Sequence, residues 1–135
     1  MYKRQVVHGR AIPNEELAAA YRSAGVVLND HHDDMREEGF VSNRLFDAVA
    51  SGARVISDPI LDAPRLTELF GPSVQVYETP DDLARLATLP DPDAVFGDES
   101  LRRAAADRVR RDHSFAARAA RLIEVAREAG AERTP

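Results

Sequence analysis

Three side chains of contrasting chemistry lie close together within residues 38–58. Asn43, Arg44 and Asp47 supply an amide, a guanidinium and a carboxylate, and at about 100° per residue they fall on one arc of a helix. Ser42 precedes them and is a good N-cap, because its hydroxyl accepts a free amide hydrogen of the first turn. Such groups beside a helix N-terminus are suited to bind the phosphates and hydroxyls of a nucleotide.

A loop, a short helix and a buried strand must position these side chains. We predict a helix over residues 43–51, ended by Gly52, and a strand over residues 54–58. The opposite arc of the helix is apolar and packs on the rest of the domain; it carries Leu45, Phe46, Val49 and Ala50. Open α/β sheets build nucleotide sites from a loop, a polar helix start, a glycine and a strand in this order.

The same stretch carries a specific order of residues: Glu38-Gly39-Phe40, then Asp47-Ala48-Val49-Ala50-Ser51-Gly52, then Val55-Ile56. This order resembles the donor-binding motif of GT-B glycosyltransferases of group 1, in the CgeB-like branch. The resemblance covers roughly residues 6–122, but only this run is specific. The chain departs from the family pattern twice. Asp47 stands where the family usually has Glu, and eight residues (39–46) separate the two acids where the family has seven.

The resemblance implies how the helix would hold a nucleotide-sugar donor. Asp47 would accept hydrogen bonds from ribose hydroxyls. The helix N-terminus and the backbone of Val41, Ser42 and Asn43 would hold the diphosphate, since free amides and the helix dipole favour an anion. Arg44 would contact phosphate and offset the charge that builds on the leaving diphosphate.

The preceding loop would complete the site. By the resemblance, Gly39 and Phe40 belong to the donor-binding loop, and Glu38 would lie nearer the sugar. Glu38 and Arg44 are therefore our catalytic candidates. The alternative interpretation is a surface ion pair between Arg44 and Asp47, three residues apart on one helix, which stabilises by about 0.2–0.5 kcal/mol.

The resemblance also implies a reaction. A sugar would pass from a nucleoside diphosphate to an acceptor hydroxyl without a metal or other cofactor, because Arg44 and helix amides do the work of a divalent cation. Acceptors in GT-B enzymes are mostly bound by an N-terminal domain, and nothing in the chain resembles one. We expect a transferase fragment that is inactive alone. The alternative is a non-catalytic Rossmann-like binding domain, either a degenerate transferase or, less well supported, a response-regulator-like module.

Composition limits the remaining possibilities. The chain has 135 residues, the size of one domain, and a net charge of −5, so nucleic acid is not the expected partner. It has no cysteine, no apolar run long enough to span a membrane and no visible signal peptide, so we expect a cytoplasmic protein. We assign residues 6–129 to the domain, residues 1–5 to a non-native or frayed terminus and residues 130–135 to a tail.

The order of elements predicts an α/β fold. Short apolar runs predict parallel strands over residues 5–9, 25–29, 54–58 and 74–77, with residues 26–28 covered on both faces and residues 74–77 at the sheet edge. Helical patterns lie between and after them, with Asn14 and Thr79 as N-caps. We predict loops over residues 29–37 and 89–97. The expected architecture is a Rossmann-like three-layer domain, the C-terminal half of a GT-B fold.

Two C-terminal helices and one loop complete the predictions. The first helix should be lined by Leu101, Ala104, Ala105 and Val109, and the second by Phe115, Ala119, Leu122, Ile123 and Ala126. The loop run His31-His32-Asp33-Asp34 contains metal-binding residue types, but adjacent residues seldom converge on one ion. We therefore favour a ligand-binding loop at the end of a strand and expect no metal.

Overall fold

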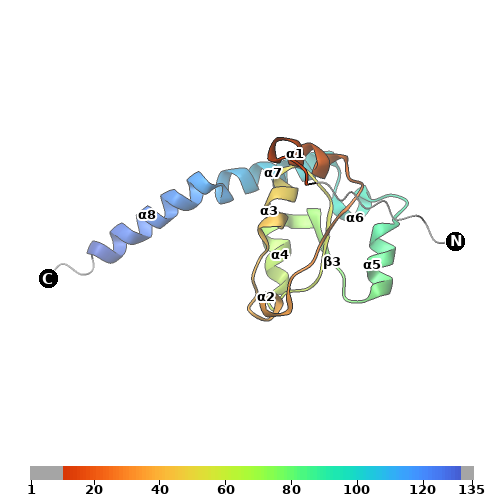
Figure 1. Ribbon diagram of the computed structural model, residues 1–135, viewed down its shortest axis with the longest axis horizontal. Coiled ribbons are helices and arrows are strands. Elements are labelled where there is room, and N and C mark those ends of the chain that lie inside the picture. The colour runs from red at the N-terminus through yellow and green to blue at the C-terminus, as the bar shows by residue number, and fades with distance from the viewer. Residues whose placement is uncertain (1–10, 132–135) are drawn as a thin grey trace.

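The computed structural model describes residues 11–131 and has alternating helices and strands (Figure 1). Three short strands, β1 (Val27–Asn29), β2 (Val55–Ser57) and β3 (Val74–Val76), form a parallel sheet in the order β1-β2-β3. The register places Ile56 opposite both Leu28 and Gln75. The predicted parallel α/β fold is therefore confirmed, with β3 at a sheet edge of the described part. The strand predicted over residues 5–9 lies outside the described residues.

Helices lie between and after the strands. They are α1 (Asn14–Ser23), α2 (Asp33–Glu37), α3 (Asn43–Ala50), α4 (Ala63–Phe70), α5 (Pro80–Ala87), α6 (Asp93–Phe96), α7 (Glu99–His113) and α8 (Phe115–Ala131), with a 3-10 turn, η1 (Gly71–Ser73), before β3. Within the described residues, no helix has the length and apolar character needed to cross a membrane.

Helices cover the sheet on both faces. On one face, buried residues of α3, α4 and α7 pack against Val55 and Val74. On the other face, Leu86 of α5 and Phe96 of α6 pack against Ile56. Because side chains alternate across a strand, Val55 and its neighbour Ile56 serve opposite layers. This arrangement is the predicted Rossmann-like three-layer domain.

The prediction that residues 26–28 are covered on both faces is wrong at Leu28. This side chain is 58% exposed, whereas its sheet neighbour Ile56 is fully buried. The helices α5 and α6 pack over Ile56 in the middle of the sheet, so the adjacent position on β1 lies beyond their cover.

Local capping explains other differences from the predicted elements. Thr79 caps α5 as predicted, since its Oγ1 accepts the Asp82 amide at 3.1 Å. Asn14 is not a cap: Pro13 occupies that position, and no side chain accepts a hydrogen bond from the first turn. The predicted loops over residues 29–37 and 89–97 each contain a short helix, α2 and α6. Acidic residues open both and favour the helix dipole there.

The two C-terminal helices also differ from the predicted pattern. On α7, Ala105 and Val109 are buried as predicted, but Arg102 and Ala106 are buried where Leu101 and Ala104 were expected, and Leu101 is 54% exposed. The Arg102 side chain turns inward and bonds the Gly97 carbonyl. The predicted apolar stripe of α8 is not buried: this helix has no buried residue and extends away from the other layers (Figure 1).

Candidate functional site

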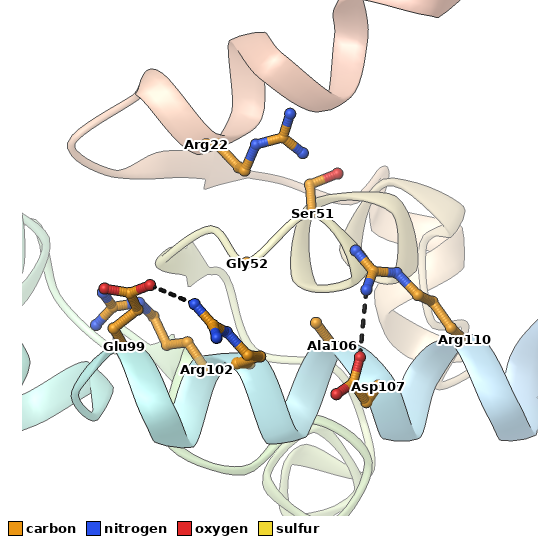
Figure 2. A pocket seen from close by; sticks show the side chains of 9 residues that line it. Arg22, Ser51, Gly52, Glu99, Arg102, Ala106, Asp107 and Arg110 are labelled. Atoms are coloured by element: carbon orange, nitrogen blue, oxygen red, sulfur yellow. Dashed lines mark hydrogen bonds and ion pairs between the residues drawn. The ribbon is translucent and has the colours of Figure 1, made fainter.

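A hollow of about 440 Å³ lies beside the turn that leads into β2 (Figure 2). It is lined by Ser51 and Gly52 and by arginines of α1 and α7. Three of these arginines already have partners: Arg103 pairs with Glu99 at 2.7 Å, Arg110 pairs with Asp107 at 3.3 Å, and Arg102 bonds Asp93 at 2.7 Å. These three charges are thus already paired within the protein, and the hollow lies at the end of α3 that is opposite the predicted site.

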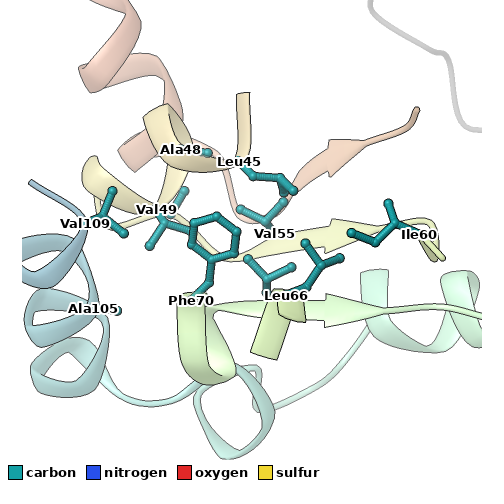
Figure 3. Close-up of a cluster of buried hydrophobic side chains, with 11 residues drawn as sticks. Leu45, Ala48, Val49, Val55, Ile60, Leu66, Phe70, Ala105 and Val109 are labelled. Atoms are coloured by element: carbon teal, nitrogen blue, oxygen red, sulfur yellow. The ribbon is translucent and has the colours of Figure 1, made fainter. Parts of the chain in front are cut away.

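The helix α3 carries the predicted site residues on its exposed face and is packed against the core by its buried face. Leu45, Ala48 and Val49 are buried in the main core (Figure 3). Phe46 packs edge-to-face on Phe70, with ring centroids 5.0 Å apart. Ser42 is the N-cap as predicted, since its Oγ accepts the Arg44 amide at 3.3 Å. The core therefore holds the helix while its first turn stays accessible.

The N-terminus of α3 lies where the strands end. Because α3 leads into β2 of a parallel sheet, its first turn is at the carboxyl edge, the place where open α/β sheets bind ligands. A hydrogen bond fixes this position: the Ser42 amide donates to Nε2 of His31, which follows β1, at 3.2 Å. Within the described residues, the next amide, that of Asn43, has no hydrogen-bond partner.

The exposed arc of α3 carries the three predicted side chains. Asn43, Arg44 and Asp47 are all exposed. Arg44 Nη1 lies 3.6 Å from Asp30 Oδ1, so the Arg44–Asp47 surface pair that we considered as an alternative is not formed. In the described part of the chain, no hydrogen bond or ion pair involves the Asp47 carboxylate. This carboxylate is therefore free to accept a ligand.

Asp47 stands between two hollows. With Asn43 and Phe46 it lines a hollow of about 310 Å³ that faces the junction of α7 and α8. It also lines a hollow of about 410 Å³ shared with Tyr21 of α1. Burial, followed by the charge of Asp47, raises the pKa of the Tyr21 phenol, and Arg44 opposes this shift. The carboxylate is thus accessible from both sides of α3.

The loop before α3 places the other predicted residues. Glu38 is the C-cap of α2 and is exposed, and Gly39 follows with a φ of 68°, a conformation that favours glycine. The Phe40 amide donates to the Met35 carbonyl at 2.9 Å, and the Phe40 ring is 48% exposed. Val41 packs against the main core. The loop therefore turns sharply and presents Glu38 and Phe40 to solvent.

Sequence reasoning missed a buried pair at the same edge. His31 Nδ1 lies 2.6 Å from Asp58 Oδ1, and the His31 amide donates to Asp58 Oδ2 at 3.0 Å. Beside them, Asn29 Nδ2 donates to Ser57 Oγ at 3.1 Å, and the buried Asn29 Oδ1 has no partner among the described residues. Their positions in the sequence could have indicated this pair, because His31 and Asp58 follow two predicted strands whose carboxyl ends lie at the same edge of the sheet.

The His31-His32-Asp33-Asp34 run does not converge. His31 is buried against Asp58, whereas the other three residues are exposed and belong to the start of α2. Across residues 11–131, no group of three or more side chains of the types His, Cys, Asp and Glu could hold a metal ion.

Comparison with known proteins gave one match. A family model described as glycosyl transferase-like matches residues 1–124. No curated protein matches the chain, and no solved structure matches it.

Proposed function

The chain belongs to the glycosyl transferase-like family, and we propose that it binds the nucleotide-sugar donor of a metal-independent glycosyltransferase at the first turns of α3. The observation that carries this proposal is the free carboxylate of Asp47 on an exposed helix face whose N-terminus lies at the carboxyl edge of the sheet. The core fixes that helix, so the site would be largely formed before ligand binds.

The spacing along α3 suits a nucleoside diphosphate. Asn43 and Asp47 are four residues apart, which places them on one face and about 6 Å apart along the helix axis. We assign the ribose hydroxyls to the Asp47 carboxylate and the diphosphate to the first turn. There the unpaired Asn43 amide and the Arg44 guanidinium supply donors for phosphate oxygens.

Arg44 is suited to act on the leaving group. Its pairing with Asp30 is loose, at 3.6 Å between exposed side chains, so a phosphate can replace Asp30 at small cost. As the bond between the sugar and the diphosphate breaks, negative charge builds on the diphosphate, and the guanidinium stabilises it. The acceptor oxygen forms its bond to the sugar carbon as the bond to the diphosphate breaks, and the acceptor proton passes to the departing diphosphate or to water. Glu38, exposed in the adjacent loop, is assigned to the sugar side of the site.

We further propose that the chain is the C-terminal half of a GT-B enzyme of the CgeB-like branch. The acceptor would then be bound by an N-terminal domain that faces the carboxyl edge of the sheet. Because the reaction needs both partners in one cleft, the chain alone should bind donor but should not transfer sugar. Transfer above a buffer blank by the isolated chain would contradict this part of the proposal.

Calorimetric titration of the purified chain with UDP and with GDP, each with and without EDTA, tests the binding function. We expect binding of at least one nucleoside diphosphate that EDTA leaves unchanged. Absence of binding to both would overturn the proposal. Binding that is never followed by transfer when the acceptor domain is supplied would indicate a degenerate transferase. Two departures from the family pattern favour that second candidate: Asp47 stands where the family usually has Glu, and eight residues separate the two acids where the family has seven.

A further inference from the structure

We propose that His31, held by Asp58, is a positioning residue that sets the N-terminal turn of α3 for diphosphate binding. The inference rests on the proposed donor site and adds two residues that lie outside the sequence motif. His31 cannot contact a ligand itself, because its side chain is completely buried. Its effect must pass through the groups that it bonds.

Asp58 is the fixed point of this arrangement. It directly follows β2 and is 5% exposed. Its carboxylate accepts the His31 amide at 3.0 Å and contacts His31 Nδ1 at 2.6 Å. Arg36 Nε lies 3.7 Å from Asp58 Oδ2, and Ser57 Oγ lies 3.5 Å from Oδ1. A buried carboxylate with several donors is held in one place, because the loss of any donor leaves part of the charge unpaired.

The His31 imidazole links Asp58 to the N-terminus of α3. Its Nε2 lies 3.2 Å from the Ser42 amide nitrogen, which is the donor, and must therefore accept. An imidazole that accepts at Nε2 and is neutral carries its proton on Nδ1, which then donates to Asp58. These contacts connect Asp58 at the end of β2, His31 in the loop after β1 and Ser42 at the N-cap of α3. One side chain thus links three elements at the edge of the sheet.

This arrangement determines which backbone amide of α3 can donate a hydrogen bond to the diphosphate. With the Ser42 amide bonded to His31, the Asn43 amide is the free donor of the first turn, and Arg44 stands beside it. Without the Nε2 acceptor, the Ser42 amide is left unpaired and the cap is free to shift. Small displacements of positioned donors weaken binding of the group that they are aimed at. Loss of the His31 contact should therefore weaken binding of a nucleoside diphosphate and leave binding of the nucleoside almost unchanged.

Two substitutions separate the two contacts of His31. In His31→Gln the side-chain amide reaches the Nε2 position and can accept from Ser42. In His31→Asn it reaches only the Nδ1 position and can donate to Asp58. His32→Asn and His32→Gln are the matched controls, since His32 is adjacent and exposed and its side chain makes no capping bond. Thermal unfolding of each variant checks that the fold is kept.

The experiment has two readouts. In wild type, nitrogen-detected NMR of the imidazole should show the proton on Nδ1; a proton on Nε2 would overturn the proposal without any ligand. In calorimetry, His31→Asn should weaken UDP or GDP binding about two- to tenfold, the worth of one hydrogen bond, while uridine or guanosine binding stays unchanged. His31→Gln should recover most of that loss.

The outcomes separate this inference from the proposed function. If wild type binds neither diphosphate, the donor site itself is refuted. If wild type binds a diphosphate and both His31 variants bind it with the wild-type affinity, the Ser42 contact has no positioning role. The same conclusion follows if His31→Gln and His31→Asn lose affinity equally. An equal loss for diphosphate and nucleoside would indicate a purely structural role and would also overturn the inference.

Discussion

Asp93 of α6 lies 2.7 Å from the Arg102 guanidinium of α7, and this pair joins two helices on different sides of the sheet. Arg102 is 9% exposed, and it also bonds the Gly97 carbonyl between the two helices. Arg54, just before β2, reaches the same Asp93 oxygen at 2.5 Å. One carboxylate therefore connects both helices to the start of the central strand.

Replacing this carboxylate should destabilise the domain in a pH-dependent manner. The hydrogen bonds from Arg54, then from Arg102, lower the pKa of Asp93. A lowered pKa stabilises the fold above the ordinary pKa of aspartate, and this contribution is lost as the pH falls through the folded-state value. We expect Asp93→Asn to lower the Tm at pH 7, and the difference from wild type to shrink as the pH falls from about 5 to below about 3. Asp91→Asn is the control, and an equal effect there would contradict the assignment.

Two leucines should differ sharply in their importance. Leu66 is fully buried between α4 and the sheet (Figure 3), whereas Leu122 on α8 is 70% exposed. Leu66→Ala should lower the free energy of unfolding by about 2–5 kcal/mol because it leaves a cavity. Leu122→Ala should change it by less than about 0.5 kcal/mol. Urea denaturation measures both, and similar losses would mean that α8 is covered in the isolated chain.

Divalent metals should not stabilise the chain through the loop after β1. His31 is already bonded on both ring nitrogens, and His32, Asp33 and Asp34 are exposed. Manganese or zinc should therefore shift the Tm little. A rise with either metal that is lost in His32→Ala would restore the metal interpretation of this run.

Much of the fold was predictable because it depends on local chemistry. Ser42 and Thr79 cap helices with their own side chains. The three strands are short and begin with apolar residues: Val27 in β1, Val55 and Ile56 in β2, and Val74 in β3. Contacts between distant residues were not predictable. Arg102 turns inward to bond Asp93 and Gly97, so a charged side chain is buried on α7 where the apolar Leu101 was expected.

The arrangement of the candidate site residues was predictable to a similar degree. The arc of Asn43, Arg44 and Asp47 follows from helical periodicity, and all three are exposed. The partner of Arg44 is Asp30, fourteen positions earlier, which periodicity within one helix cannot indicate. His31 and Asp58 meet only because two strands lie side by side, so their pairing needed the sheet.

Titration of nucleoside diphosphate into Asp47 variants tests the central proposal most directly. A hydrogen bond to a charged group contributes about 1.5–3 kcal/mol, so Asp47→Ala should raise the Kd for UDP or GDP roughly ten- to a hundredfold. Asp47→Glu keeps the carboxylate and should lose far less. Arg44→Ala should weaken diphosphate binding more than nucleoside binding.

The control is Glu68→Ala, which removes an exposed carboxylate from α4. It should bind like wild type, and every variant should keep the wild-type Tm within a few degrees. A wild type that binds while Asp47→Ala, Arg44→Ala and Glu68→Ala bind equally well would contradict the assignment of the donor site to α3.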